Sequence, residues 1–153
     1  MNACSNKDAR YMQIAGEEAN KSMVAYKHGC VAVASGKIVA RGFNNYRTYS
    51  RDGLIKHTCS CHAEIDVLRK CKKRNITKKI TLYVARVMRS DPYTLNFSRP
   101  CKECYETMKE FNIKRLVYSD RNGELINNNM IDFVSTFVSS GQTAIKKQRV
   151  KLL

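Results

Sequence analysis

The sequence predicts an α/β fold in which helices cover both faces of a mixed sheet. One observation is the order of segments, because helix-like and strand-like stretches alternate and strand–helix–strand units follow an opening strand pair. The other is the length of 153 residues, which suits one domain with a substantial core. We therefore expect a single domain over residues 1–153, arranged as a three-layer α/β/α sandwich.

The first part of the chain predicts a helix followed by a hairpin. From Asp8 to about Tyr26, apolar residues recur near helical spacing, which is typical of an amphipathic helix. The pattern then changes to two strands, CVAVA at 30–34 and IVARGF at 38–43. A short connection with glycine joins them, so we expect the strands to pair antiparallel. Cys30 is expected in the core, since free cysteine is among the most buried residues.

The later elements follow a polar, turn-rich segment. In order, they are a helix from His62 to about Arg74, a strand at 80–87, a helix at 101–112 and a strand at 114–118. Apolar residues then recur as in a helix at Ile131, Phe133, Val134, Phe137 and Val138. We therefore expect a C-terminal helix and a basic tail within 121–153.

Two short motifs, CHAE and PCKEC, stand where the second and third helices are expected to begin. Their His62, Cys101 and Cys104 offer one imidazole and two thiolates to Zn²⁺, which leaves the fourth position of a tetrahedral ion for water. An open position distinguishes a catalytic zinc site from a structural one, and bound zinc lowers the pKa of water to about 7. Glu64 lies two residues after His62, so it does not share the histidine's helix face. It is better placed beside the water than as a fourth ligand.

A structural zinc without chemistry is the alternative to this interpretation. One version of it would use Cys59 and Cys61 together with Cys101 and Cys104 as four thiolate ligands.

The order of the motifs, His-x-Glu and then Pro-Cys-x-x-Cys, resembles the signature of zinc-dependent nucleobase deaminases. On these residues the chain is identified as a member of the cytidine and deoxycytidylate deaminase superfamily, which also contains tRNA adenosine deaminases and polynucleotide cytidine deaminases. The resemblance covers about residues 8–120. It implies a mixed sheet of about five strands, one catalytic zinc on His62, Cys101 and Cys104, and assembly into at least a dimer. Glu64 would carry a proton from the water to the ring nitrogen and then to the departing ammonia.

The same resemblance implies three substrate contacts. Asn44 would contact the sugar, the Ala63 backbone would approach the base, and Ser98 would place a backbone carbonyl near the exocyclic amine. Each residue also has an ordinary explanation. Asparagine and serine are common in turns, and alanine is a good helix former.

The phosphate contacts of deoxycytidylate deaminases cannot be transferred to this chain. Those enzymes usually follow the asparagine with a glycine and a proline-containing loop, whereas this chain reads Asn-Asn-Tyr-Arg. Arg47, Arg51 and Lys56 are candidates on their charge and loop position alone.

A second, structural zinc is an alternative that the sequence favours less. His57, Cys59 and Cys61 crowd the segment before the first motif, but a tetrahedral site needs a fourth ligand. Cys4, His28, Cys30 and Cys71 are available for it without an obvious spacing. We expect His28 to be an ordinary surface or hydrogen-bonded histidine.

The net charge of +15 should attract anions such as phosphates. The leading hypothesis is deamination of a cytosine nucleotide or nucleoside, with deoxycytidylate slightly favoured. One alternative is an RNA or DNA deaminase, including the tRNA adenosine type, in which the loop aromatics Tyr46, Tyr49, Tyr93 and Phe97 would stack on bases. A second is a non-enzymatic, zinc-stabilised module that binds nucleic acid.

The N-terminal ten residues are polar, and no apolar run approaches the roughly 18 residues of a membrane span. The cysteines lack the regular spacing of small secreted folds. We expect reduced thiols, no membrane segment and a cytoplasmic protein.

Overall fold

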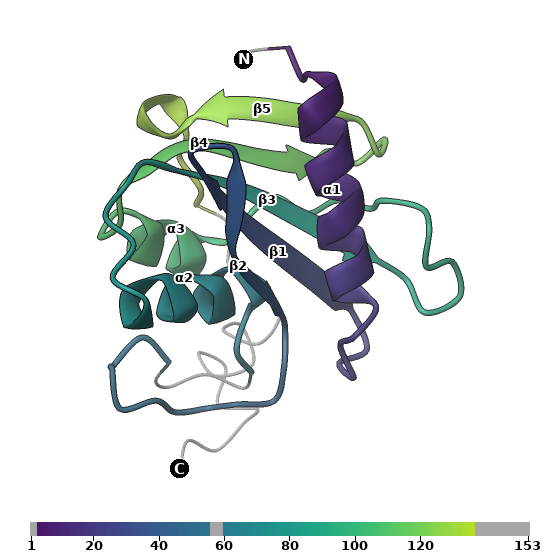
Figure 1. Cartoon of the computed structure of the whole chain (residues 1–153). Helices are drawn as coiled ribbons and strands as arrows, with labels where there is room; N and C mark the ends of the chain where they lie inside the picture. Colours follow the sequence, from purple (N-terminus) through teal and green to yellow (C-terminus); the bar gives the residue numbers. More distant parts are fainter. Residues whose placement is uncertain (1–2, 56–59, 137–153) are drawn as a thin grey trace.

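A five-stranded mixed sheet forms the middle layer of the computed structural model, which describes residues 3–55 and 60–136 (Figure 1). The strands are β1 (Lys27–Ala34), β2 (Lys37–Phe43), β3 (Ile80–Val87), β4 (Ile113–Ser119) and β5 (Leu125–Asn129). Their order across the sheet is β2-β1-β3-β4-β5. The β3–β4 pair is parallel and the other three pairs are antiparallel. The predicted mixed sheet and the predicted hairpin are both confirmed.

Helices cover both faces of this sheet (Figure 1). Helix α1 (Asn6–Ala19) packs on one face, while α2 (Ala63–Lys73) and α3 (Lys102–Met108) lie together on the other. The three-layer α/β/α sandwich is therefore confirmed. Among the residues that the structure describes, no helix combines the length and the apolar character needed to cross a membrane.

Side chains alternate between two hydrophobic clusters, one on each face of the sheet. On β1, Cys30 and Ala32 belong to the cluster under α2 and α3, whereas Val31 and Val33 belong to the one under α1. The same alternation runs along β3. Cys30 is fully buried, as predicted.

Helix α1 begins at a capping box and ends earlier than the sequence pattern indicates. The Ser5 hydroxyl accepts a hydrogen bond from the Asp8 backbone N–H, and the Asp8 carboxylate accepts one from the Ser5 N–H. The helix ends at Ala19, so the prediction of a helix to Tyr26 is wrong. Tertiary contacts explain the difference: the Ser22 hydroxyl donates to the Asn44 carbonyl, and β1 already begins at Lys27.

Two glycines let the helices approach the β1–β2 hairpin closely. A Cβ on Gly29 would lie 2.0 Å from the backbone oxygen of Ala15 in α1. A Cβ on Gly42 would lie 2.5 Å from a carboxylate oxygen of Asp66 in α2. Strand β1 therefore touches the backbone of α1, and the contact at Gly42 fixes the position of α2 over β2.

The chain after β4 differs from the sequence prediction. A turn around Gly123, whose φ is +80°, leads into β5, and a short 3₁₀ helix (Met130–Asp132) follows. The C-terminal helix expected from Ile131 is not formed in the described residues, because Phe133 begins an irregular stretch with extended backbone. The expected helical positions Phe137 and Val138 and the basic tail lie outside the described residues.

The strand directions bring the starts of α2 and α3 to one edge of the sheet. Because β2 and β3 are both antiparallel to β1, and β4 is parallel to β3, the carboxyl ends of these three strands share that edge. Helix α2 follows β2 along the chain and α3 follows β3. In α/β sheets this edge is the usual place for a binding site.

Candidate metal centre and active site

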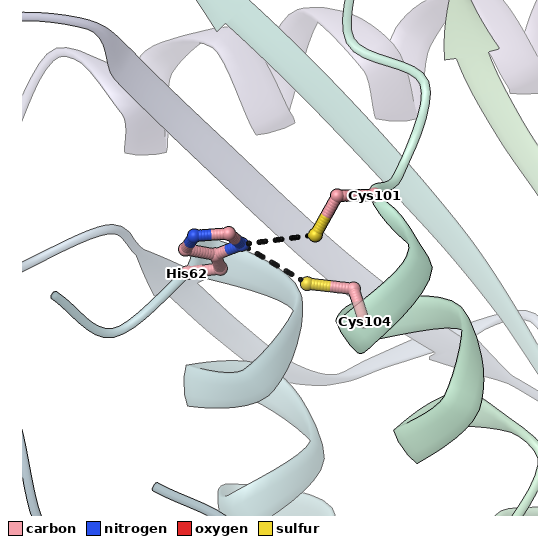
Figure 2. Close-up of side chains that lie close together, drawn as sticks. All are labelled: His62, Cys101 and Cys104. Carbon is pink, nitrogen blue, oxygen red and sulfur yellow. Dashed lines mark hydrogen bonds between the residues drawn. The ribbon is translucent and has the colours of Figure 1, made fainter. Parts of the chain in front are cut away.

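His62, Cys101 and Cys104 converge at the starts of α2 and α3 (Figure 2). His62 Nδ1 lies 3.2 Å from Cys104 Sγ and 3.5 Å from Cys101 Sγ, and the three ligand atoms are all within 4.8 Å of one another. Around a tetrahedral zinc ion, a ligand nitrogen and a ligand sulfur are separated by about 3.6 Å. Both the chemistry and the spacing of these three side chains fit zinc.

Two backbone connections hold the ligands in place. Asn45 and Cys61 exchange two backbone hydrogen bonds, of 3.0 and 2.8 Å, which closes the segment between β2 and α2 just before His62. On the other side, the Ser98 N–H donates to the Ser119 carbonyl, and the Ser98 hydroxyl donates to the Val84 carbonyl. These bonds fix the approach to Cys101 against the ends of β3 and β4.

The metal-free ligands share protons among themselves. A hydrogen bond from the Cys104 thiol lowers the pKa of Cys101 to about 4, and His62 adds to the effect. Burial opposes ionisation of His62, but its contact with Cys101 raises the imidazole pKa to about 9. The pKa of Cys104 is raised, first by its contact with the Cys101 thiolate and then by burial. Without a bound metal, these shifts favour a protonated imidazole, one thiolate and one thiol at neutral pH.

Glu64 lies in the first turn of α2, two residues after the ligand His62, and its side chain is buried. It does not belong to the group of three ligand atoms. Burial raises the pKa of this carboxyl, while the neighbouring His62 lowers it. Glu64 is thus a buried carboxyl group close to the ligands but outside their set.

A hollow of about 270 Å³ opens beside the metal centre. His62 and Cys104 line it, together with Ile65 of α2 and Thr107 of α3. The ligands are thus next to a space between the two helices.

The three expected substrate contacts lie near the metal ligands in sequence or at the same edge of the sheet. Asn44 is buried and directly follows β2. Its side-chain amide binds two backbone groups: Oδ1 accepts a hydrogen bond from the His28 N–H, and Nδ2 donates one to the Tyr26 carbonyl. Ala63 is fully buried and begins α2. Ser98 is buried, and its hydroxyl donates the hydrogen bond to the Val84 carbonyl of β3 described above.

The candidate phosphate contacts do not gather at the metal centre. Arg47 is exposed, its Nε donates to the Tyr49 carbonyl, and it lines a separate hollow with Asp52 and Asp66. Arg51 is exposed. Lys56 lies outside the described residues.

Of the residues proposed for a second zinc site, the structure describes Cys61, so that site stays a prediction. Cys61 is buried, its Sγ donates to the His62 carbonyl, and burial raises its thiol pKa to about 12. Among the described residues, the group that could hold a metal is His62, Cys101 and Cys104, and Cys61 is not part of it. His57 and Cys59 lie outside the described residues.

Arg86 and Tyr26, which were not predicted from the sequence, lie near the edge of the sheet where α2 and α3 begin. Arg86 stands on β3 two residues after the buried Val84, and Cα pairing places it opposite His28 of β1. The signal for Arg86 was the alternation within β3, which puts this charged residue on the face that carries Leu82 and Val84. Tyr26 stacks with Arg86, whose Cζ lies 4.8 Å from the ring centroid.

Three side chains that fit zinc, with a buried carboxyl group close to them, are typical of a zinc-dependent hydrolytic enzyme. The family described as the cytidine and deoxycytidylate deaminase zinc-binding region matches residues 5–120. The chain therefore belongs to this family of zinc-dependent deaminases.

Solved structures of the same fold include two deaminases. The apo dCMP deaminase of the cyanophage S-TIM5 is 20% identical, with a TM-score of 0.58, over 79% of this chain and 89% of the phage chain. The same phage enzyme was also solved with dCMP and dUMP, with a TM-score of 0.55 over 78% of this chain and 85% of that chain. The cytidine deaminase of Burkholderia pseudomallei is 16% identical, with a TM-score of 0.58, over 88% of this chain and 100% of the bacterial one. No curated protein sequence matches the chain.

Proposed function

We propose that the chain deaminates a cytosine nucleotide or nucleoside, with a monophosphate such as dCMP favoured. The products are the corresponding uracil nucleotide or nucleoside and ammonia. The observation that carries this proposal is the arrangement of three zinc ligands with buried Glu64 beside them. A cyanophage enzyme that acts on dCMP and a bacterial enzyme that acts on cytidine share the fold.

Hydrolytic deamination forms a C–O bond at C4 of the base and breaks the C–N bond to the exocyclic amine. Bound zinc supplies a Lewis acid that activates the water molecule. Glu64 accepts a proton from that water, delivers it to the ring nitrogen, and then protonates the departing amine. His62, Cys101 and Cys104 hold the metal, and the buried position of Glu64 keeps its carboxylate away from bulk water.

Asn44 supports this site mainly by holding the backbone of Tyr26 and His28 in position. One amide hydrogen and one carbonyl lone pair are committed to Tyr26 and His28, so the amide keeps one hydrogen and one lone pair for a sugar hydroxyl. We propose that Asn44 makes this sugar contact, and that the Ala63 and Ser98 backbones contact the base.

The test is ammonia release from cytidine, deoxycytidine, their 5′-monophosphates, adenosine and a short RNA, measured with zinc-loaded wild type and Glu64→Gln. We expect Glu64→Gln to keep zinc and fold and to lose at least about 10²- to 10⁴-fold in turnover, because glutamine cannot carry the proton. Glu110→Gln, which changes an exposed glutamate, is the matched control and should retain activity.

Each other outcome corrects the proposal in a defined way. Near-normal turnover by Glu64→Gln would refute the assigned role, and loss of zinc would place Glu64 among the ligands. Ammonia release from RNA or adenosine alone would replace the cytosine nucleotide with a polynucleotide or adenine substrate. The exposed Tyr46 and Tyr49 are available for stacking in that case.

We also propose that the protein assembles into at least a dimer and is cytoplasmic. Assembly is what the resemblance to the deaminase family implies. The cysteines of the described residues are free thiols, which is typical of reducing compartments.

A further inference from the structure

The Arg86 side chain lies on the face of the sheet that α2 and α3 cover. Along β3, Leu82 and Val84 belong to the cluster under α2 and α3, whereas Tyr83 and Ala85 belong to the cluster under α1. Side chains alternate along a strand, so Arg86 shares the face of Val84. Arg86 is also near the carboxyl end of β3, the edge at which α2 and α3 begin.

The neighbours of Arg86 connect it to the metal ligands. His28 is its cross-strand partner on β1, and Tyr26 packs against its guanidinium. Burial lowers the pKa of His28 to about 4, and the nearby cations Arg86 and His62 lower it further. Arg86 and His62 are thus both close enough to His28 to act on it electrostatically, which places Arg86 on the metal-centre side of the sheet.

Among the described residues, no carboxylate forms an ion pair with Arg86. Its Nε is buried and has no hydrogen-bond partner there. The sequence outside the described ranges contains no Asp or Glu side chain, so it offers no side-chain carboxylate for pairing.

The buried Nε of Arg86 is costly, because burial removes its hydration and no hydrogen bond replaces it among the described residues. A planar guanidinium is also well suited to bidentate contact with phosphate oxygens. An anionic ligand would thus supply what the protein lacks at this position, and a neutral nucleoside would not.

We propose that Arg86 binds the phosphate of a nucleoside 5′-monophosphate in the active site and selects this substrate class over the nucleoside. The inference rests on the proposed deaminase function. It assigns to Arg86 the role for which Arg47, Arg51 and Lys56 are the candidates from sequence.

The test compares kcat/KM for dCMP and deoxycytidine, and for CMP and cytidine, in zinc-loaded full-length wild type and Arg86→Gln. Wild type should prefer the monophosphates. Arg86→Gln should lose about 10- to 100-fold of that preference, mainly through a higher KM for the monophosphate, because a hydrogen bond to a charged group is lost. Turnover of the nucleosides should change little. Arg89→Gln, an exposed arginine three residues further along, is the matched control and should keep the wild-type preference.

Direct binding separates this inference from the proposed function. Calorimetric titration with dUMP and with deoxyuridine measures recognition of the phosphate even if no tested substrate is deaminated. Arg86→Gln should weaken dUMP binding about 10- to 100-fold and leave deoxyuridine binding nearly unchanged, with zinc content and melting temperature close to those of wild type. A nucleoside preference in wild type, or equal losses for both ligands in Arg86→Gln, would overturn the inference. Loss of the preference in Arg47→Gln but not in Arg86→Gln would do the same.

Discussion

Asp8 is the residue whose replacement should most clearly weaken the attachment of α1 to the sheet. Its buried carboxylate accepts hydrogen bonds from the Tyr83 hydroxyl at 2.6 Å and from two nitrogens of Arg115 at 3.1 and 3.3 Å. Burial alone would raise the Asp8 pKa, but hydrogen bonds from Arg115 and Tyr83 hold it at about 2, below the ordinary value of 3.8. The ionised carboxylate therefore stabilises the folded state.

The magnitude follows from this difference in pKa. At about 1.4 kcal/mol per pH unit, the interactions of ionised Asp8 are worth about 2 kcal/mol. Because the folded-state pKa is depressed, this stabilisation is complete above about pH 4 and is lost as the pH falls toward 2. Asp8→Asn also leaves Arg115 without its anion. The Arg115 side chain is 25% exposed, so we expect a total cost of about 3 kcal/mol, at the lower end for a broken buried pair.

Urea unfolding of zinc-loaded protein at pH 7 measures this cost. With a slope of about 2 kcal/mol per molar urea, the midpoint of Asp8→Asn should fall by about 1.5 M. Glu106→Gln removes the exposed Glu106–Lys109 pair of 2.7 Å and should change stability by less than about 0.5 kcal/mol. The difference between Asp8→Asn and wild type should shrink between pH 4 and pH 2, while zinc release affects both proteins alike. A midpoint for Asp8→Asn that matches the Glu106→Gln control would refute the reasoning.

Three further predictions concern the metal and the assembly. Purified protein should carry close to one zinc per chain by metal analysis, and His62→Ala should lose it. Binding of zinc to metal-free protein at pH 7 should release about two protons, because the pKa shifts favour protonated His62 and Cys104 and an ionised Cys101. Calorimetry in buffers of different ionisation enthalpy measures the number of protons released. Zinc binding without proton release would contradict this assignment. Light scattering at micromolar concentration should show at least a dimer, and a monomer would remove that proposal.

The metal ligands could be predicted from sequence because their spacing is local. Each motif sits at a helix start, where the chain direction is set by residues a few positions away, and the three-layer order follows from the alternation of segments. The sheet topology is needed only to predict that the two helix starts converge.

The features missed from sequence depend on distant partners. Strand β5 reads Leu-Ile-Asn-Asn-Asn, and asparagine is depleted in strands, so its pairing with β4 decides its structure. The turn signal at Asn122 and Gly123 was nevertheless present before it. The early end of α1 depends on Ser22, whose partner Asn44 is 22 residues away. The environment of Arg86 likewise depends on His28 across the sheet.

The metal ligands also join parts of the chain that are far apart in sequence. His62 is separated from Cys101 by 39 residues and from Cys104 by 42. A zinc ion shared among them closes a loop of that size, much as a disulfide would, and in a chain-entropy model such a cross-link removes about 4 kcal/mol of freedom from the unfolded chain. Helix α1 has its own attachment through Asp8 and does not depend on this loop. Metal depletion should therefore speed amide hydrogen exchange in α2 and α3 before it affects α1, so one face of the sheet can loosen while the other remains folded.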